Sequence, residues 1–269
     1  MVNIIIQYFR VNRDENDENY HKLCERQEEY NHCLKKNLEY EHLESLHVLL
    51  ETYEDYTELC SVVDVENCEK LVIFFINKRM NYKEAFEYAN EKLNDKIVVI
   101  LHSDIFLLSG FDLIDKDVHF LEKKMYALTR TNIYQGQDTD NRNNVRVKII
   151  NGKKYSATID GWCLRTPIEE NIVNEAFHQQ NVFGSENRLI YIFKTNNYEV
   201  ISPKCLVMIH WHKSSARSNL NTNWIKMDGS LIPNDEFQRW RKKNRGIANS
   251  ICGGDIPRRK GTAERTNYL

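Results

Sequence analysis

Three short apolar segments constrain the fold of this chain more than any other feature. They are residues 2–9 (VNIIIQYF), 71–76 (LVIFFI) and 97–101 (IVVIL), and isoleucine and valine recur in all three. An apolar run of this length and composition is typical of a strand that is buried on both faces of a sheet. All three runs are far shorter than the roughly 20 apolar residues that a membrane-spanning helix requires. We therefore predict three buried strands.

The segments between these runs have helical periodicity. Residues 20–37 repeat apolar side chains at near-helical spacing, and residues 81–93 do the same with Asn81 as the N-cap. Residues 46–50 (LHVLL) predict a further short strand, whereas the acidic residues 51–58 favour a solvated loop or one helical turn. Strands that alternate with helices predict an α/β fold with parallel strands. Ligands of such sheets bind outside the carboxyl ends of the strands.

The second half of the chain predicts a mixed arrangement. Strands are expected at 124–131, 155–165, 198–201 and 206–212, with short helices at 169–178 and 186–193 and a polar loop at 135–145. Gly161 predicts a turn within the second of these strands. Residues 221–269 contain ten Lys or Arg against five Asp or Glu. We predict one domain, residues 1–220, and a basic C-terminal extension, residues 221–269, which is either solvated or contacts an anionic acceptor or a partner protein.

The composition excludes several classes of function. The 39 acidic and 37 basic residues give a net charge of −2, which argues against a nucleic-acid coat or a polybasic membrane binder. The 7 cysteines are odd in number and lack the spacing of zinc sites, which favours reduced thiols. The first residues lack the features of a signal peptide. We expect a soluble, cytoplasmic protein with no nucleic-acid partner and no transmembrane segment.

Polar residues lie at the end of the first apolar run and directly after the other two. They occupy positions 7–10, 77–79 and 102–104, and strand order predicts that they converge at one sheet edge. Asp104 is the acid among them, and a divalent cation that bridges a diphosphate needs only one or two protein carboxylates. A lone aspartate at a strand end is, however, more often a turn former or a helix cap.

Two further groups of residues are candidates for chemistry. His210 and His212 lie two apart on an expected strand and so face one side, where imidazole nitrogens suit Mn²⁺ better than Mg²⁺. The alternative is a pair of surface histidines. Glu186 opens an expected helix and Asp160 precedes Trp162. One of the two acids is a candidate general base and Trp162 a sugar-stacking platform; the alternatives are a helix-terminal carboxylate and a core tryptophan.

Five motifs occur in an order that resembles one enzyme class. They are HSDIF, ALTR, IDGWCLR, GSENRLIY and HWHKSSAR, at residues 102–106, 127–130, 159–165, 184–191 and 210–217. This order resembles that of GT-A-fold glycosyltransferases, especially small enzymes of large DNA viruses and bacteria. Those enzymes have N-S-D-I-F/Y-F, A-L-T/S-R, Q/S-D-A-W-I-F-R, G-C/S-D/E-N-R-x-x-Y and H-x-H-x-S-x-x-R. The similarity covers residues 2–217.

The resemblance implies a GT-A-like, Rossmann-like mixed sheet flanked by helices. It also implies metal-dependent transfer of a sugar from a nucleotide-diphosphate sugar, a UDP-sugar before a GDP-sugar, to a hydroxyl acceptor such as a glycan or a protein-linked glycan. The cofactor would be Mn²⁺ or Mg²⁺, held by Asp104 with His210 or His212. If the enzyme inverts the anomeric configuration, Glu186 would be the base, with Asp160 as the second choice; the attack geometry differs in a retaining enzyme, and the sequence does not decide between the two.

The resemblance also implies which residues hold the donor. Ser103 would lie near the ribose, and His102 stands where the family has Asn or Asp. Lys213 or Arg217 would stabilise the charge that develops on the diphosphate. The other candidates for nucleotide-sugar binding are Gln7, Tyr8, Phe9, Arg10, Arg79, Tyr82, Arg130 and Trp162.

Two other classes of function are weighed against this one. A metal-dependent phosphoesterase or nucleotidyltransferase also uses acids and histidines, but it usually needs two metals and hence several clustered carboxylates. Asp104 is the only carboxylate in the polar segment 102–104. A non-catalytic nucleotide-sugar-binding module would bind the donor without transferring the sugar.

Overall fold

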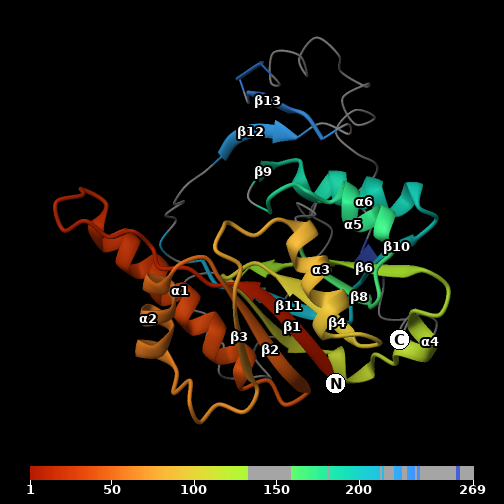
Figure 1. The fold of residues 1–269 in the computed structure, drawn as a ribbon, viewed down its shortest axis with the longest axis horizontal. Coiled ribbons are helices and arrows are strands. Elements are labelled where there is room, and N and C mark those ends of the chain that lie inside the picture. The colour runs from red at the N-terminus through yellow and green to blue at the C-terminus, as the bar shows by residue number, and fades with distance from the viewer. Residues whose placement is uncertain are drawn as a thin grey trace.

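The computed structural model describes residues 1–132, 159–180, 182–212, 214, 221–225, 229–233, 235–236 and 259–260. Its centre is an 8-stranded sheet with the order β14-β10-β6-β8-β4-β1-β2-β3 (Figure 1). These strands are β1 (Val2–Gln7), β2 (Leu43–Leu50), β3 (Leu71–Phe75), β4 (Ile97–Leu101), β6 (Lys124–Thr129), β8 (Ile159–Arg165), β10 (Glu199–Pro203) and β14 (Arg259–Lys260).

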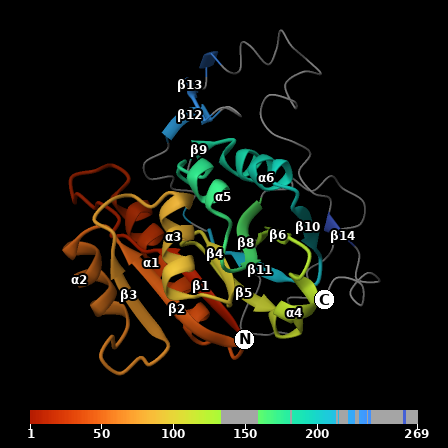
Figure 2. The ribbon, with the colours of Figure 1, turned by 45° about the vertical axis from the view of Figure 1, so that its right-hand side comes forward.

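Helices cover both faces of this sheet. They are α1 (Tyr20–Leu38), α2 (Tyr53–Val62), α3 (Tyr82–Lys92), α4 (Lys116–His119), α5 (Glu170–Glu175) and α6 (Ser185–Thr195), with a short 3-10 helix at Phe111–Leu113. Helices α1 and α2 lie on one side of the sheet and α3, α5 and α6 on the other (Figure 2). Ile4 and Ile6 pack into a core with residues of α1 and α2, whereas Ile5 packs into a second core with residues of α3, α5 and α6. The predicted fold class, a mixed α/β sheet flanked by helices, is confirmed.

The first half of the chain forms the parallel part of the sheet. Strand β1 pairs in parallel with β2 and β4, and β2 pairs in parallel with β3. The predicted burial of the 71–76 strand is wrong, because β3 is an edge strand and its Phe74 is 40% exposed. The acidic segment after β2 forms α2, a full helix whose N-cap Thr52 makes a capping box with Asp55, where a loop or one turn was expected.

The antiparallel strand β8 joins the two halves of the sheet. It pairs with β4 on one side and with β6 on the other, and β10 then pairs in parallel with β6. The predicted turn at Gly161 is wrong, because Gly161 lies inside β8. A Cβ atom at this position would lie 2.8 Å from Leu101 Cδ2 and 2.9 Å from Met208 Sδ. The glycine therefore serves close packing between strands.

Two small sheets complete the described part. Strands β5 (Ile105–Ser109), β11 (Val207–His210) and β7 (Thr131–Asn132) form one, in the order β5-β11-β7. Strands β9 (Val182–Phe183), β12 (Asn221–Ile225) and β13 (Leu231–Pro233) form the other. Short strands of the basic extension thus pair with strands of the preceding region, and a division into domains at residue 220 stays a prediction. The predicted loop at 135–145 lies outside the described residues.

Among the described residues, no helix is both long and apolar enough to cross a membrane. The six cysteines of this part, Cys24, Cys33, Cys60, Cys68, Cys163 and Cys205, are all free thiols.

Candidate active site

The three polar segments at the carboxyl ends of the parallel strands converge as predicted. Gln7 Nε2 donates to the carbonyl of Lys78 at 3.2 Å, and the amide of Met80 donates to Gln7 Oε1 at 3.2 Å. Ser103 Oγ donates to the carbonyl of Gln7 at 2.5 Å. Hydrogen bonds therefore join the end of β1 to both loops and define the edge at which the other candidates gather.

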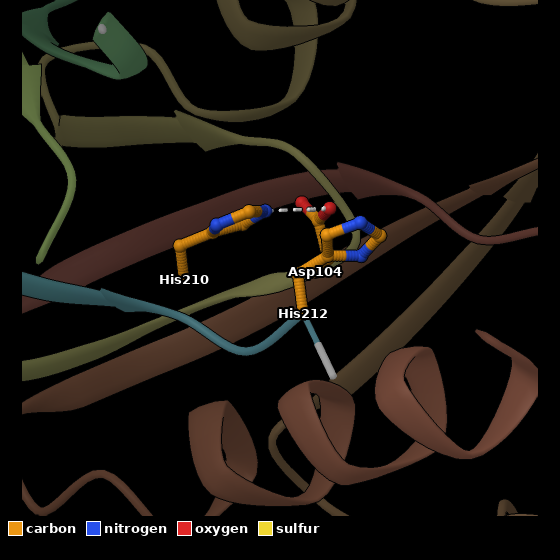
Figure 3. Close-up of side chains that lie close together, drawn as sticks. All are labelled: Asp104, His210 and His212. Atoms are coloured by element: carbon orange, nitrogen blue, oxygen red, sulfur yellow. Dashed lines mark hydrogen bonds and ion pairs between the residues drawn. The ribbon is translucent and has the colours of Figure 1, made fainter. Parts of the chain in front are cut away.

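Asp104 lies in the turn between β4 and β5, where β11 brings His210 beside it. His210 pairs with Ile105 across the β5–β11 ladder, and the amide of Trp211 donates to the Asp104 carbonyl at 2.9 Å. His210 Nε2 lies 3.1 Å from Asp104 Oδ2 (Figure 3). The predicted strand 206–212 ends at His210, yet the ring of His212 still stacks on that of His210, with centroids 5.3 Å apart.

Asp104, His210 and His212 form a candidate metal site. One ligand atom from each residue lies within 4.8 Å of the others. One carboxylate oxygen and two imidazole nitrogens are donors that suit Mn²⁺. The donor set therefore fits the implied metal.

A cationic side chain from α1 already contacts two of these residues. Arg26 Nη2 donates to Asp104 Oδ2 at 2.6 Å, and Arg26 Nη1 lies 2.5 Å from His212 Nδ1. Glu29, one helical turn further on, accepts from Arg26 Nη1 at 2.7 Å and from the amide of Ser214 at 2.6 Å. Asn37 anchors the same helix to β5, because it donates to the Ile105 carbonyl and accepts from the Leu107 amide.

These contacts keep Asp104 ionised. Burial alone would raise its pKa, but the hydrogen bond from His210 and the positive charge of Arg26 hold the pKa of Asp104 well below its ordinary value. Burial likewise opposes ionisation of Glu29, but hydrogen bonds from His212, Arg26 and the Ser214 amide lower its pKa to about 2. The pKa of Arg26 rises despite burial, chiefly because of the charge of Asp104. The ionised carboxylates of Asp104 and Glu29 therefore favour a positive charge between them, which Arg26 supplies.

A second group of ionisable residues lies at the start of β8. The amide of His102 donates to the Asp160 carbonyl at 3.4 Å, so the start of β8 lies beside the end of β4. Arg130 Nε lies 3.3 Å from Asp160 Oδ2, and His102 Nδ1 lies 3.6 Å from Asp160 Oδ1. Burial raises the pKa of Asp160, although His102 and Arg130 oppose this effect.

Glu186 lies in the first turn of α6, close enough to Asp160 for the two charges to interact. Gly184 caps this helix with φ +83°, a left-handed conformation that glycine adopts without strain. Burial, and then the negative charge of Asp160, raise the pKa of Glu186 to about 8. A carboxyl group with such a pKa exchanges its proton near neutral pH, as a general base must. His178 fixes the start of the helix, because its Nε2 lies 3.1 Å from the Ser185 carbonyl.

Several other candidates lie in the core. Tyr8 and Tyr82 are each 0% exposed and Trp162 is 1% exposed. Trp162 Nε1 donates to Tyr82 Oη at 3.0 Å, and the two rings meet edge to face. Trp162 therefore exposes no face on which a sugar could stack, and the alternative of a core tryptophan fits the structure. Tyr8 Oη donates to Asn31 on α1 at 2.5 Å.

The remaining nucleotide candidates lie nearer the surface. The guanidinium of Arg79 stacks over the ring of Phe9, 4.2 Å from its centroid, and burial lowers the pKa of Arg79. Arg10 is exposed, and its amide donates to Asp55 at 2.6 Å. Lys213 and Arg217 lie outside the described residues.

Arg26 and Glu29 are the site residues that the sequence reasoning missed. A usable signal was present, because they precede Tyr30 and Cys33 by four residues each and so share the buried stripe of the helix. Charged residues on an apolar stripe need buried partners, and here the partners are Asp104 and His212.

Comparison with known proteins assigns no family. No protein-family model matches the chain, and no curated protein matches it. A mannosyltransferase from Pyrobaculum calidifontis in complex with GDP-Man and Mn²⁺ is 12% identical, with a TM-score of 0.48, over 81% of this chain and 58% of that chain. The chain thus spans little more than half of that protein.

Two further solved structures are similar at comparable levels. TarS 1–349 of S. aureus in complex with UDP-GlcNAc is 12% identical, with a TM-score of 0.33, over 51% of this chain and 36% of that one. The 4-diphosphocytidyl-2C-methyl-D-erythritol synthase of Anaerococcus prevotii is 10% identical, with a TM-score of 0.42, over 80% of this chain and 89% of that one. Similarities of this size assign no activity to the chain.

Proposed function

We propose that this chain is a metal-dependent glycosyltransferase that moves a sugar from a nucleotide-diphosphate sugar to a hydroxyl acceptor. One observation carries the proposal: at one sheet edge Asp104 lies with His210 and His212 as a candidate metal site, and Asp160, beside the end of β4, lies near Glu186 at the start of α6. Asp104 is held ionised beside two histidines, whereas the pKa of Glu186 is raised to about 8. Acids whose environments push their pKa values apart are typical of a site in which one binds charge and the other moves a proton.

The Asp104 side is proposed to bind the diphosphate through a metal. Asp104, His210 and His212 would hold Mn²⁺, or Mg²⁺, and the ion would act as a Lewis acid on the leaving diphosphate. Lys213 or Arg217 would add positive charge to the same group. Ser103, fixed to the end of β1 by its hydrogen bond to Gln7, would lie near the ribose.

The loops after β1 and β3 are proposed to hold the nucleotide. Arg79 offers a planar cation stacked on Phe9, and Arg10 offers an exposed one. Gln7 fixes the loop that carries Arg79 by bonding to both Lys78 and Met80. Tyr8 and Tyr82 would support these groups from the core.

Glu186 is proposed to take the proton from the acceptor hydroxyl. Because its pKa is raised to about 8, a part of the Glu186 population is ionised near neutral pH and can accept a proton, and this part grows as pH rises. Asp160 is the second choice, because Arg130 and His102 lie beside it and partly neutralise its charge. His102 and Arg130 would then orient Asp160 toward the sugar.

The test combines binding with turnover. UDP- and GDP-sugars are screened for a rise in melting temperature with and without Mn²⁺, and those that bind are assayed for donor hydrolysis and transfer. The proposal expects Mn²⁺-dependent binding together with release of the nucleoside diphosphate. Binding without hydrolysis or transfer would favour a binding module, and phosphate release from model esters would favour a phosphoesterase. No stabilisation by any nucleotide would contradict both the glycosyltransferase and the nucleotide-sugar-binding module.

A further inference from the structure

We propose that Arg26 is a resident cation of the Asp104 cluster, and that a divalent metal must displace its guanidinium to bind. The inference rests on the metal site of the proposed function and adds a residue from α1 to it. It makes two states of the cluster mutually exclusive: one in which Arg26 contacts Asp104 and His212, and one in which a metal does.

The contact distances place the guanidinium in the space that a metal needs. Arg26 Nη2 lies 2.6 Å from Asp104 Oδ2, and Nη1 lies 2.5 Å from His212 Nδ1. A metal would lie about 2.0–2.3 Å from the same kinds of ligand atom. An ion bound to Asp104 Oδ2 and His212 Nδ1 would therefore occupy the space in which the two guanidinium nitrogens now lie.

The hydrogen-bonding chemistry gives the same result. A guanidinium only donates, so His212 Nδ1 accepts from Arg26 in the tautomer that leaves its lone pair free; in the other tautomer Nδ1 carries the proton and donates to Glu29 Oε2, which lies 3.2 Å away. A metal bound to Nδ1 would use that same lone pair. In the tautomer that accepts from Arg26, the guanidinium therefore competes for the electron pair of His212 as well as for the space beside Asp104.

Arg26 has other partners that allow exchange without leaving a buried charge unpaired. Nη1 also donates to Glu29 at 2.7 Å, and Nε donates to Tyr30 Oη at 2.9 Å, with the guanidinium 4.6 Å from the Tyr30 ring centroid. The Ser214 amide fixes Glu29 from the other side at 2.6 Å. Because a guanidinium does not lose its proton in proteins, it must move to admit a metal, and Glu29 and Tyr30 can retain it when it does.

Mn²⁺ binding to the protein without nucleotide tests the exchange. Free Mn²⁺ is measured by electron paramagnetic resonance during titration of the wild type, Arg26→Met and the double variant Arg26→Met/Glu29→Gln. The double variant removes one positive and one negative charge, so it separates occupancy of the site from a change in net charge. We expect both variants to bind Mn²⁺ at least tenfold more tightly than the wild type. Arg165→Met, which removes an arginine bonded to Asp95 at the other end of β8, is the control and leaves the affinity unchanged.

The outcomes separate this inference from the proposed function. Equal Mn²⁺ affinity in all proteins would overturn the exchange and leave the metal site intact. Tighter binding in Arg26→Met alone would assign the effect to net charge and also overturn it. Binding in both Arg26 variants but not in the wild type would support the exchange and contradict metal-dependent activity. Absence of Mn²⁺ binding in every protein would overturn both. If Arg26→Met fails to fold, Arg26→Lys keeps the charge without the planar fork and is expected to bind more tightly than the wild type.

Discussion

The pKa values of the carboxyl groups on the two sides of the sheet edge shift in opposite directions. On the α1 side, burial of Asp104 is outweighed by the hydrogen bond from His210 and the charge of Arg26, so its pKa falls. On the α6 side, burial and the charge of Asp160 raise the pKa of Glu186 to about 8. The sheet lies between the two helices, and Asp160, whose pKa also responds to the charges of Asp104 and His210, lies between the two groups.

The difference shows how one edge can bind a cation and move a proton. An acid held ionised by positive neighbours keeps its charge across the physiological range and attracts a cation. A carboxyl group whose pKa is raised toward neutral pH can both accept and release a proton near that pH. α1, which carries Arg26, and α6, which carries Glu186, pack into different cores on the two faces of the sheet.

Replacement of the proposed base is expected to have the largest effect. Glu186→Gln keeps the shape of the side chain but cannot accept the proton, so the transfer rate should fall by about 10²–10⁴-fold. The measurement is steady-state transfer at saturating donor. Glu170→Gln is the matched control, because Glu170 also lies in the first turn of a helix but is exposed. Equal turnover in the wild type and Glu186→Gln would move the role to Asp160.

Replacement of the proposed metal ligand Asp104 should weaken Mn²⁺ binding and leave the Glu186 side unchanged. Asp104→Asn removes the ionised oxygen, and Mn²⁺ affinity should fall by roughly a hundredfold or more, since loss of outer contacts alone costs 10–100-fold at metal sites. The Mn²⁺ affinity is measured from the rise in melting temperature with increasing Mn²⁺ concentration. Asp112→Asn, at an exposed aspartate in the 3-10 helix, is the control. An Asp104→Asn protein that is still stabilised by Mn²⁺ to the wild-type extent would remove Asp104 from the site.

The raised pKa of Glu186 also predicts how stability depends on pH. Folding raises this pKa from its ordinary 4.5 to about 8, so between these values the folded state binds more protons than the unfolded state. The contribution of Glu186 is therefore fully present below about pH 4.5 and is lost as pH rises to about 8. Urea unfolding of the wild type and of Glu186→Gln across this range measures it. The stability of the wild type relative to the variant should decline with pH; parallel curves would show that Glu186 titrates normally.

The smallest expected effect concerns Asn81, whose helix α3 is linked through His178 to the start of α6. Asn81 caps α3 by accepting from the Glu84 amide, and the next residue, Tyr82, donates its amide to the His178 carbonyl. Asn81→Ala should lower the free energy of unfolding by about 1 kcal/mol. Because His178 also contacts the start of α6, transfer should weaken more than Mn²⁺ binding does. A variant that lost Mn²⁺ binding first would show that the two sides are not independent.

The local pattern of the chain predicts the parallel half well. The strands β1 and β4 and the helices α1 and α3 follow from apolar runs, periodicity and the Asn81 cap, all of which depend on neighbouring residues. The rule that ligands gather at carboxyl ends of strands then predicts the meeting of Gln7, Ser103 and Lys78.

Long-range packing decides the features that the sequence did not predict. The exposure of β3 depends on its place at the sheet edge, and the role of Gly161 depends on Leu101 and Met208, which approach it from other strands. Arg26 belongs to the site because the turn after β4 brings Asp104, and the segment after β11 brings His212, beside α1. Strand order sets these contacts, and spacing along the chain does not reveal it.

Mn²⁺-dependent binding of UDP and GDP to Asp104→Asn and Glu186→Gln, measured by calorimetry, tests the division of roles most directly. If Asp104 binds the metal and Glu186 moves the proton, Glu186→Gln binds a nucleoside diphosphate as the wild type does, while Asp104→Asn loses the Mn²⁺-dependent part. Equal loss in both variants, or Mn²⁺-dependent binding retained by Asp104→Asn, would contradict it.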